Sequence, residues 1–307
     1  MTPKLRSDLL LLLAALIWGL AFVAQRVGMD HTGPLTFNAT RFALGAVALT
    51  PLMLARARTG GPGGGPAAPW PADLRRGLGL GLVLFGGATL QQMGVVHTTA
   101  GKAGFITGLY VVLVPILGLA VGQRTHGRTW MGALLAVAGL YLLSITGRLH
   151  MQRGDLLVLV GALFWAVHVL LIGRWAPKTE PVRLAALQFA VCALLSGVGA
   201  FTFEEPAWSG IRGAMWPILY AGLMSTGVAY TLQVVAQRDA PPAHAAIILS
   251  LESVFAVLGG MVMLGEALSV RGWLGAALML AGMIASQLEP RRRAAPSAQR
   301  ETPGARP

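Results

Sequence analysis

The feature that most constrains this chain is a series of long, continuously apolar segments. Ten segments of about 20 residues each are present, at 8–29, 36–55, 75–96, 101–122, 129–147, 155–174, 182–203, 214–236, 243–264 and 271–288. A helix of about 20 residues, rising about 1.5 Å per residue, crosses the roughly 30 Å hydrocarbon core of a bilayer. The segments lack the alternation of apolar and polar residues that marks the strands of a membrane barrel. The sequence therefore predicts an all-α integral membrane protein with ten transmembrane helices.

The composition agrees with burial in lipid. Only 12% of the 307 residues are charged, against roughly 25% in an average soluble domain. The net charge of +12 would suggest a nucleic-acid partner in a soluble protein, but the basic residues lie mostly in short loops between apolar segments. We therefore expect a lipid bilayer and no nucleic acid as partner. The single cysteine, Cys192, and the scattered histidines predict no disulfide, no metal site and no cofactor.

The distribution of basic residues predicts the orientation. If the N-terminus lies in the cytoplasm, 17 Lys and Arg residues fall on the cytoplasmic side and 6 on the outer side, with Arg41 inside a segment. Loops that stay in the cytoplasm carry the excess of Lys and Arg. We therefore expect a multi-pass protein of the inner (plasma) membrane with both termini in the cytoplasm.

The second half of the chain repeats the first. Asp8-Leu9-Leu10 recurs as Asp155-Leu156-Leu157 and Trp18 recurs as Trp165, both at an offset of 147 residues. Thr89-Leu90-Gln91 recurs as Thr231-Leu232-Gln233 at an offset of 142. Each half holds five segments, an odd number, so the second half enters the membrane from the opposite face. Inverted repeats are typical of secondary transporters, which bind their solute near the midplane between the halves.

The repeat predicts the domain organisation. A five-helix repeat at 1–147 and an inverted five-helix repeat at 154–290 surround a central cavity. They are joined by a connector at 148–153 and followed by a basic, disordered tail at 291–307.

Several motifs resemble one family. These are the tryptophan-containing first segment, the run GKAGFITGLYVVLVP at 101–115 and its counterpart AAIILSLESVFAVLGGMVMLGEAL at 245–268. They resemble the EamA type of the drug/metabolite transporter superfamily over nearly the whole chain up to residue 290. Ser253 stands where many members have proline, and Gln123 or Arg124 stands near the usual Gly-Glu of the first half. The resemblance implies ten helices, with the first four of each half around a central cavity, and export of small metabolites.

The repeat also ranks the polar residues. Polar groups at matched positions inside the segments are expected to face the space between the halves, because a polar side chain that faces lipid costs several kcal/mol. Three pairs meet this condition: Arg41 with Gln188, Gln91 with Gln233, and Tyr110 with Glu252. We predict that these six side chains bind the solute.

Two readings stay open for each ionisable group inside a segment. Glu252 either binds a cationic group or carries a coupling proton, or it forms a structural pair with Arg41. Arg41 either binds a solute carboxylate, or snorkels to the nearer interface in a structural role. His168 either relays protons or forms a hydrogen bond between helices. An intramembrane acid or base is more often functional than not.

Aromatic residues complete the predicted site. Trp18, Trp165 and Tyr230 can form walls for an apolar or aromatic solute, although ordinary packing between helices is an equally good reading for each alone. Pro115 is expected to kink the fourth segment.

These observations predict a secondary transporter, an exporter of small organic metabolites such as amino acids, that works by alternating access. No catalytic residue is predicted, because an intramembrane enzyme needs a reactive cluster that the segments lack. A membrane scaffold would not need matched polar pairs. A nucleotide-sugar or lipid-carrier translocator would need several cations in the cavity, where only Arg41, and Lys102 at the start of a segment, are available. The oligomeric state and the role of proton coupling stay open.

The orientation can be tested with reporter fusions. We expect a fluorescent protein fused to the C-terminus to fluoresce, and alkaline phosphatase at the same point to stay inactive, because that end lies in the cytoplasm. Fusion of the phosphatase after Gly33 serves as the control and should be active. Phosphatase activity at the C-terminus would contradict the predicted orientation.

Overall fold

A computed structural model describes residues 2–59, 70–98, 100–144, 153–264 and 269–287. The predicted tail at 291–307 and all of the predicted connector except Arg153 lie outside the described residues.

The described chain is built from helices. In order, they are α1 (Pro3–Gly28), α2 (Pro34–Thr59), α3 (Trp70–Val96), α4 (Ala100–Gly108), α5 (Tyr110–Ala120), α6 (Gly127–Ser144), α7 (Arg153–Trp175), the 3₁₀ turn η1 (Ala176–Lys178), α8 (Pro181–Phe203), α9 (Trp208–Gly213), α10 (Met215–Leu219), the π-helix η2 (Tyr220–Tyr230), α11 (Thr231–Ala236), α12 (Pro242–Leu249), α13 (Glu252–Leu264) and α14 (Val270–Gln287).

Eight helical stretches in the described part are long and apolar enough to cross a membrane. They are Pro3–Gly28, Pro34–Arg56, Pro71–Val96, Ala103–Ala120, Arg153–Lys178, Pro181–Phe203, Met215–Ala236 and Pro242–Met263. The segments predicted at 129–147 and 271–288 correspond to α6 and α14, which are not among these eight. The apolar part of α14, Val270–Ser286, is shorter than the others. The fold is thus all-helical and crosses the membrane many times.

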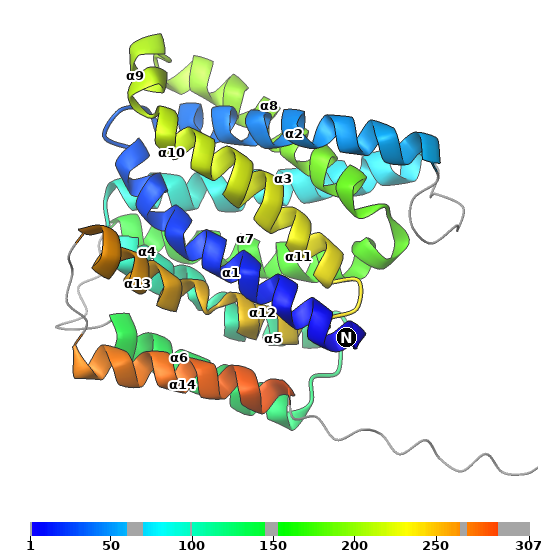
Figure 1. Cartoon of the computed structure of the whole chain (residues 1–307), viewed down its shortest axis with the longest axis vertical. Coiled ribbons are helices and arrows are strands. Elements are labelled where there is room, and N and C mark those ends of the chain that lie inside the picture. The colour runs from blue at the N-terminus through cyan, green and yellow to red at the C-terminus, as the bar shows by residue number, and fades with distance from the viewer. Residues whose placement is uncertain (1, 60–69, 99, 145–152, 265–268, 288–307) are drawn as a thin grey trace, which may run out of the picture.

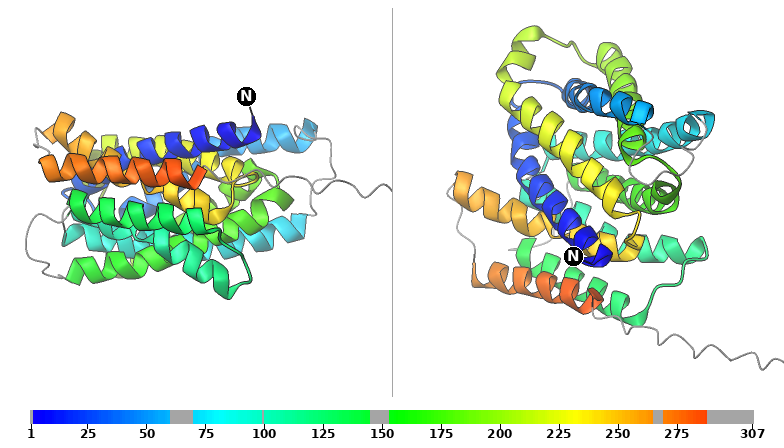
Figure 2. Two further views of the ribbon diagram at one scale, coloured as in Figure 1. Left: turned by 90° about the horizontal axis from the view of Figure 1, so that it is seen from below. Right: turned by 45° about the vertical axis from the view of Figure 1, so that its right-hand side comes forward.

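The helices form a layered bundle around α1. Helices α2 and α8 lie side by side at one end of the molecule, α6 and α14 lie side by side at the other, and α1 runs diagonally between them (Figure 1). Two further views show that α6 and α14 form a pair at the edge of the bundle (Figure 2).

Carboxylates join α2 to the α8 region at both ends. Glu204, which follows α8, accepts hydrogen bonds of 2.8 Å from the backbone N–H groups of Leu35 and Thr36 at the start of α2. At the other end, Arg56 forms a 2.9 Å ion pair with Glu180, the N-cap residue of α8. A carboxylate at a helix N-terminus satisfies N–H groups that have no partner within the helix. These contacts fix α2 and α8 as an antiparallel pair that joins the two halves.

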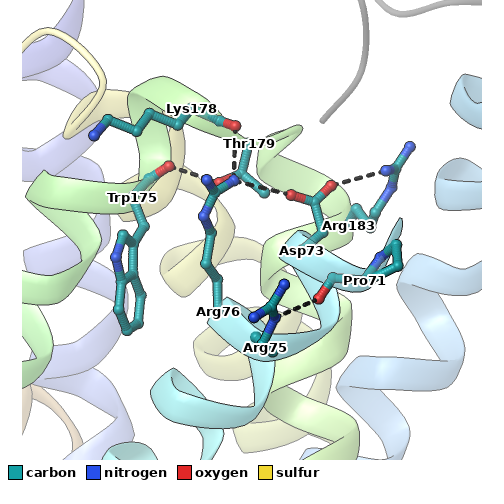
Figure 3. A network of polar contacts seen from close by, with 8 residues as sticks. All are labelled: Pro71, Asp73, Arg75, Arg76, Trp175, Lys178, Thr179 and Arg183. Atoms are coloured by element: carbon teal, nitrogen blue, oxygen red, sulfur yellow. Dashed lines mark hydrogen bonds and ion pairs between the residues drawn. The ribbon is translucent and has the colours of Figure 1, made fainter. Parts of the chain in front are cut away.

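A second polar network joins α3 to α8 (Figure 3). The fully buried carboxylate of Asp73 receives Arg183 at 2.8 Å and Arg76 at 3.2 Å, and Arg76 also donates to the carbonyl of Lys178 at 3.0 Å. Burying a carboxylate is costly unless it is paired, and here two guanidinium groups compensate it. Arg76 and Arg183, expected as loop cations, therefore bind Asp73.

The two helices next to the predicted cavity are interrupted at matched positions. Leu109 separates α4 from α5, and Ser250 with Leu251 separates α12 from α13. The predicted kink at Pro115 is placed wrongly, because α5 continues through Pro115 and the interruption lies more than one turn earlier. The second half is interrupted without a proline. There the Ser250 hydroxyl donates to the carbonyl of Ile247 at 2.8 Å, a local bond that competes with the helical pattern.

Glycines bring α6 and α14 into close contact. A Cβ atom at Gly132 would lie 2.7 Å from the carbonyl oxygen of Gly282, and one at Gly139 would lie 2.5 Å from that of Gly275. Such distances leave no room for a side chain. The pair is therefore held by direct packing of backbone on backbone, as is common between membrane helices.

This contact predicts the effect of a single methyl group. We expect Gly139→Ala to lower the free energy of unfolding by about 1–3 kcal/mol, because overpacking a close contact displaces its partner. Gly127→Ala is the control, since nothing lies within 4 Å of its Cβ position and alanine favours a helix by up to about 1 kcal/mol. Thermal unfolding in detergent measures both. A Gly139→Ala protein as stable as Gly127→Ala would contradict the packing.

Candidate substrate cavity

A small cavity lies between the two interrupted helices, α1, α3 and the π-helix η2. Nine of the ten predicted site residues border it: Trp18, Arg41, Gln91, Tyr110, Trp165, His168, Tyr230, Gln233 and Glu252. Its volume is ≈ 40 Å³, enough for a few water molecules, whereas sites for small organic ligands commonly measure about 300–1,000 Å³. The helices are therefore drawn together around the cavity in this conformation.

Arg41 supplies the positive charge of the cavity. Its side chain is only 2% exposed, and its Nε donates to Asn38 Oδ1 at 2.9 Å. The guanidinium carbon lies 4.5 Å from the ring centroid of Phe42 and 5.9 Å from that of Phe37. Aromatic faces attract a cation at such distances. The side chain thus stays at the cavity and does not snorkel.

Glu252 supplies the negative charge. It is 5% exposed and is the first residue of α13, where the positive end of the helix dipole favours a carboxylate. Within the described part of the chain, neither Glu252 Oε1 nor the hydroxyl of Tyr110 has a hydrogen-bond partner. No ion pair joins Glu252 to Arg41 among the residues described. The structural Arg41–Glu252 pair considered from the sequence is therefore not formed.

The matched glutamines have different surroundings. Gln91 Oε1 accepts from Trp165 Nε1 at 2.8 Å and from the Thr107 hydroxyl at 3.3 Å, and Gln91 Nε2 donates to Gln25 Oε1 at 3.2 Å. Gln233 Oε1, in contrast, has no hydrogen-bond partner among the described residues. The amide of Gln233 is thus open to a ligand, while that of Gln91 is held in place.

His168 and Gln188 contact each other. His168 Nε2 lies 2.7 Å from Gln188 Oε1, and both side chains are buried. Gln188 is not among the residues that border the cavity, so it lies behind His168. This is the hydrogen bond between helices that was the alternative reading for His168.

The ring of Tyr230 is the centre of an aromatic cluster. Its centroid lies 4.6 Å from Trp18, 5.8 Å from Phe189, 6.2 Å from Trp165 and 6.3 Å from Phe42. Trp18 is held in addition by a 3.1 Å hydrogen bond from its indole N–H to the carbonyl of Ser225. The rings pack on one another and also form one wall of the cavity.

Sequence reasoning missed three polar residues that border the cavity: Gln25, Thr107 and Ser225. Gln25 and Thr107 have apolar counterparts in the other half, Ile172 and Leu249 at the offsets of 147 and 142. A filter that requires polar residues in both halves therefore rejects them. Their polarity within an apolar segment was the signal that could have found them.

The described residues contain no group of three or more His, Cys, Asp or Glu side chains that could hold a metal ion. The chemistry of the cavity is that of one cation, one anion, free amide and hydroxyl groups, and aromatic surface. Such a set can bind a small solute by charge and shape.

Known proteins share this chain's sequence and fold. The model of the EamA-like transporter family matches it twice, over residues 5–145 and 152–286. An uncharacterized transporter of Archaeoglobus fulgidus is 34% identical over 283 residues, which cover 92% of this chain and 85% of that protein. The uncharacterized transporter YwfM of Bacillus subtilis is 28% identical over 297 residues, covering 93% of this chain and 95% of YwfM.

Two further matches agree. YedA, an uncharacterized inner membrane transporter of Escherichia coli, is 24% identical over 281 residues, covering 88% of this chain and 86% of YedA. A solved crystal structure has the same fold, with a TM-score of 0.76 at 21% identity, covering 92% of this chain and 98% of that one. Since the family model matches both halves and a relative exceeds 30% identity along nearly the whole chain, this protein is a membrane transporter that belongs to the EamA-like transporter family.

Proposed function

We propose that this transporter exports a small zwitterionic, amphiphilic solute such as an amino acid, and that it does so by alternating access. The observation that carries the proposal is the pair of opposite charges in one cavity. Arg41 and Glu252 both border the cavity without pairing with each other, next to the aromatic cluster around Tyr230. The proposed export direction follows from the resemblance to the EamA type.

Electrostatic complementarity favours a zwitterion. A buried charge is costly when it has no partner, and a bound carboxylate and ammonium would compensate Arg41 and Glu252 respectively. The face of Tyr230 and the indole of Trp18 provide apolar surface for the rest of the solute. A solute with only one charge would leave one of the two protein charges without a partner.

Other solutes and functions fit less well. A nucleotide-sugar or phosphate-bearing lipid carries several negative charges, and Arg41 is the only Lys or Arg among the described residues that border the cavity. The side chain of Lys102 lies outside the described part. An enzyme or a scaffold is disfavoured by the family to which the chain belongs.

Inverted five-helix halves with ten spans and cytoplasmic termini are part of the proposal. Two contacts support them. Gly132 and Gly139 correspond to Gly275 and Gly282 at an offset of 143 residues, and the close contacts join Gly132 to Gly282 and Gly139 to Gly275. Exchange of the halves therefore maps the α6–α14 contact onto itself. The interruptions at Leu109 and Leu251, 142 residues apart, also correspond. In inverted-repeat transporters, interrupted helices border the binding site.

The volume of the cavity supports alternating access. An amino acid does not fit into ≈ 40 Å³, so the helices have to separate on one side for solute to enter. A fold with two equivalent halves of opposite orientation has an equivalent way of opening on each side.

The first test of the proposed solute concerns Arg41. We expect Arg41→Gln to weaken binding of phenylalanine and of 3-phenylpropionate, which carry a carboxylate, roughly 10- to 150-fold, because it removes a charged hydrogen bond. Binding of phenethylamine, which lacks the carboxylate, should change little. Counterflow in proteoliposomes measures all three. The exposed Arg212→Gln variant is the control, and equal losses for the three compounds would contradict the assignment.

The second test concerns Glu252. Glu252→Gln keeps the shape and removes the charge, so we expect weaker binding of phenylalanine and phenethylamine, by a similar factor, and little change for 3-phenylpropionate. If Glu252 instead carries a coupling proton, the variant keeps its affinity and loses the pH dependence of transport. Glu205→Gln, on an exposed residue, is the control. Normal affinity and normal transport at every pH would show that Glu252 is structural.

A further inference from the structure

A buried polar chain lies at the N-terminal end of α1. Asp8 Oδ1 lies 2.7 Å from His244 Nε2 at the start of α12, and their side chains are only 10% and 9% exposed. His244 Nδ1 in turn lies 3.2 Å from the hydroxyl of Ser286 in α14. Asp8 belongs to the first half, and His244 and Ser286 belong to the second. The contact therefore joins the two halves at one end of the bundle.

A corresponding contact involves the repeat partner of Asp8. Asp155, 147 residues later, is 1% exposed and accepts a 2.7 Å hydrogen bond from the Thr98 hydroxyl. Thr98 precedes α4, as His244 lies at the start of α12. Here the acid comes from the second half and its partner from the first. The repeat that pairs the cavity residues thus also pairs two contacts between the halves.

The two contacts lie at opposite ends of the bundle. Gln25, near the end of α1, contacts Gln91 and Gln92 near the end of α3, so these helices run in the same direction. Helix α7 runs the other way, because Gly94 approaches Gly154 and Gly79 approaches Trp175. The start of α7, and with it Asp155, therefore lies at the end opposite to Asp8.

The cavity lies midway between the two acids. Trp18 follows Asp8 by ten residues, and Trp165 follows Asp155 by ten residues. At about 1.5 Å per residue, each acid lies roughly 15 Å along its helix from a cavity tryptophan. The positive-inside rule assigns the Asp8 end to the cytoplasm and the Asp155 end to the outside.

The Asp8 contact also forms part of the wall of a larger hollow. Asp8, His244 and Ser286 border a space of ≈ 470 Å³ that opens at this end of the bundle, a volume in the range of small-molecule sites. Between it and the central cavity lie fully buried apolar side chains of α1 and α12, Leu11 and Ile248 among them. Separation of Asp8 from His244 would start to open this layer toward the central cavity.

We propose that the Asp8–His244 contact is the cytoplasmic gate of the transporter and that the Thr98–Asp155 contact is the corresponding outer gate, each released when the central cavity opens on its side. The inference rests on the proposed alternating access. Both contacts are buried, join opposite halves and are related by the internal repeat, so motion of the halves that strains one relieves the other. Asp8, His244, Thr98 and Asp155 act as positioning residues and do not touch the solute.

The test is the accessibility of a cysteine in the cavity. Ser225→Cys places a thiol at the cavity, in a background in which the buried Cys192 is replaced by alanine. A charged, membrane-impermeant thiol reagent is applied to inside-out and to right-side-out vesicles. Asp8→Ala should raise the labelling rate from the cytoplasmic side about tenfold, because a charged hydrogen bond is lost, without raising it from outside. Thr98→Val, which keeps the shape and removes the hydroxyl, should raise the rate from outside only.

The controls are the exposed residues Asp30→Ala and Thr202→Val, which should leave both rates unchanged. If Asp8→Ala does not fold, Asp8→Asn, which keeps an acceptor oxygen, should give a smaller shift from the same side. Unchanged rates in the gate variants, or a rise from the same side in both, would overturn the proposal. Labelling needs no solute, so failure of the phenylalanine assays would leave this result intact, and the reverse also holds.

Discussion

Lipid offers no hydrogen-bond partners, and the rest of this structure follows from that constraint. Every backbone N–H and C=O group in the hydrocarbon has to be satisfied within the protein, so the chain forms helices. Polar side chains have to find partners on neighbouring helices or face an internal space. Asp73 binds two arginines, Glu204 caps a helix of the other half, and His168 bonds Gln188. These bonds position the helices that enclose the cavity.

The polar groups left without partners are therefore informative. Glu252 Oε1, Gln233 Oε1 and the Tyr110 hydroxyl lie at one cavity and have no hydrogen-bond partner in the described residues. Tyr110 and Glu252 are each the first residue after a helix interruption. An interruption puts a helix terminus, with its unsatisfied backbone groups, at the centre of the protein. A solute that brings charges of both signs would satisfy this site, and the two gates would decide from which side it enters.

Prediction from the sequence worked where a residue's role depends on its own segment. Membrane helices follow from apolar length, and the matched pairs led to Gln91, Tyr110, Gln233 and Glu252, which the structure brings to one cavity. The same reasoning failed where a contact depends on a distant helix. Gln188 lies behind His168, Gln25 has no polar counterpart, and the repeated Asp8 and Asp155 were used only as evidence of a repeat. Their partners, His244 and Thr98, lie 236 and 57 residues away in the chain.

The sequence by itself determined that this protein is helical, crosses the membrane many times, repeats its first half and belongs near the EamA type. Those properties are local or periodic, since apolar length and residue spacing decide them. Only the tertiary structure decided that Arg41 and Glu252 do not pair, that the cavity is contracted to ≈ 40 Å³, and that buried polar contacts join the halves at both ends. The reason is that the packing of each helix against its neighbours sets the direction and the partner of every side chain, and spacing along one segment carries no record of that packing.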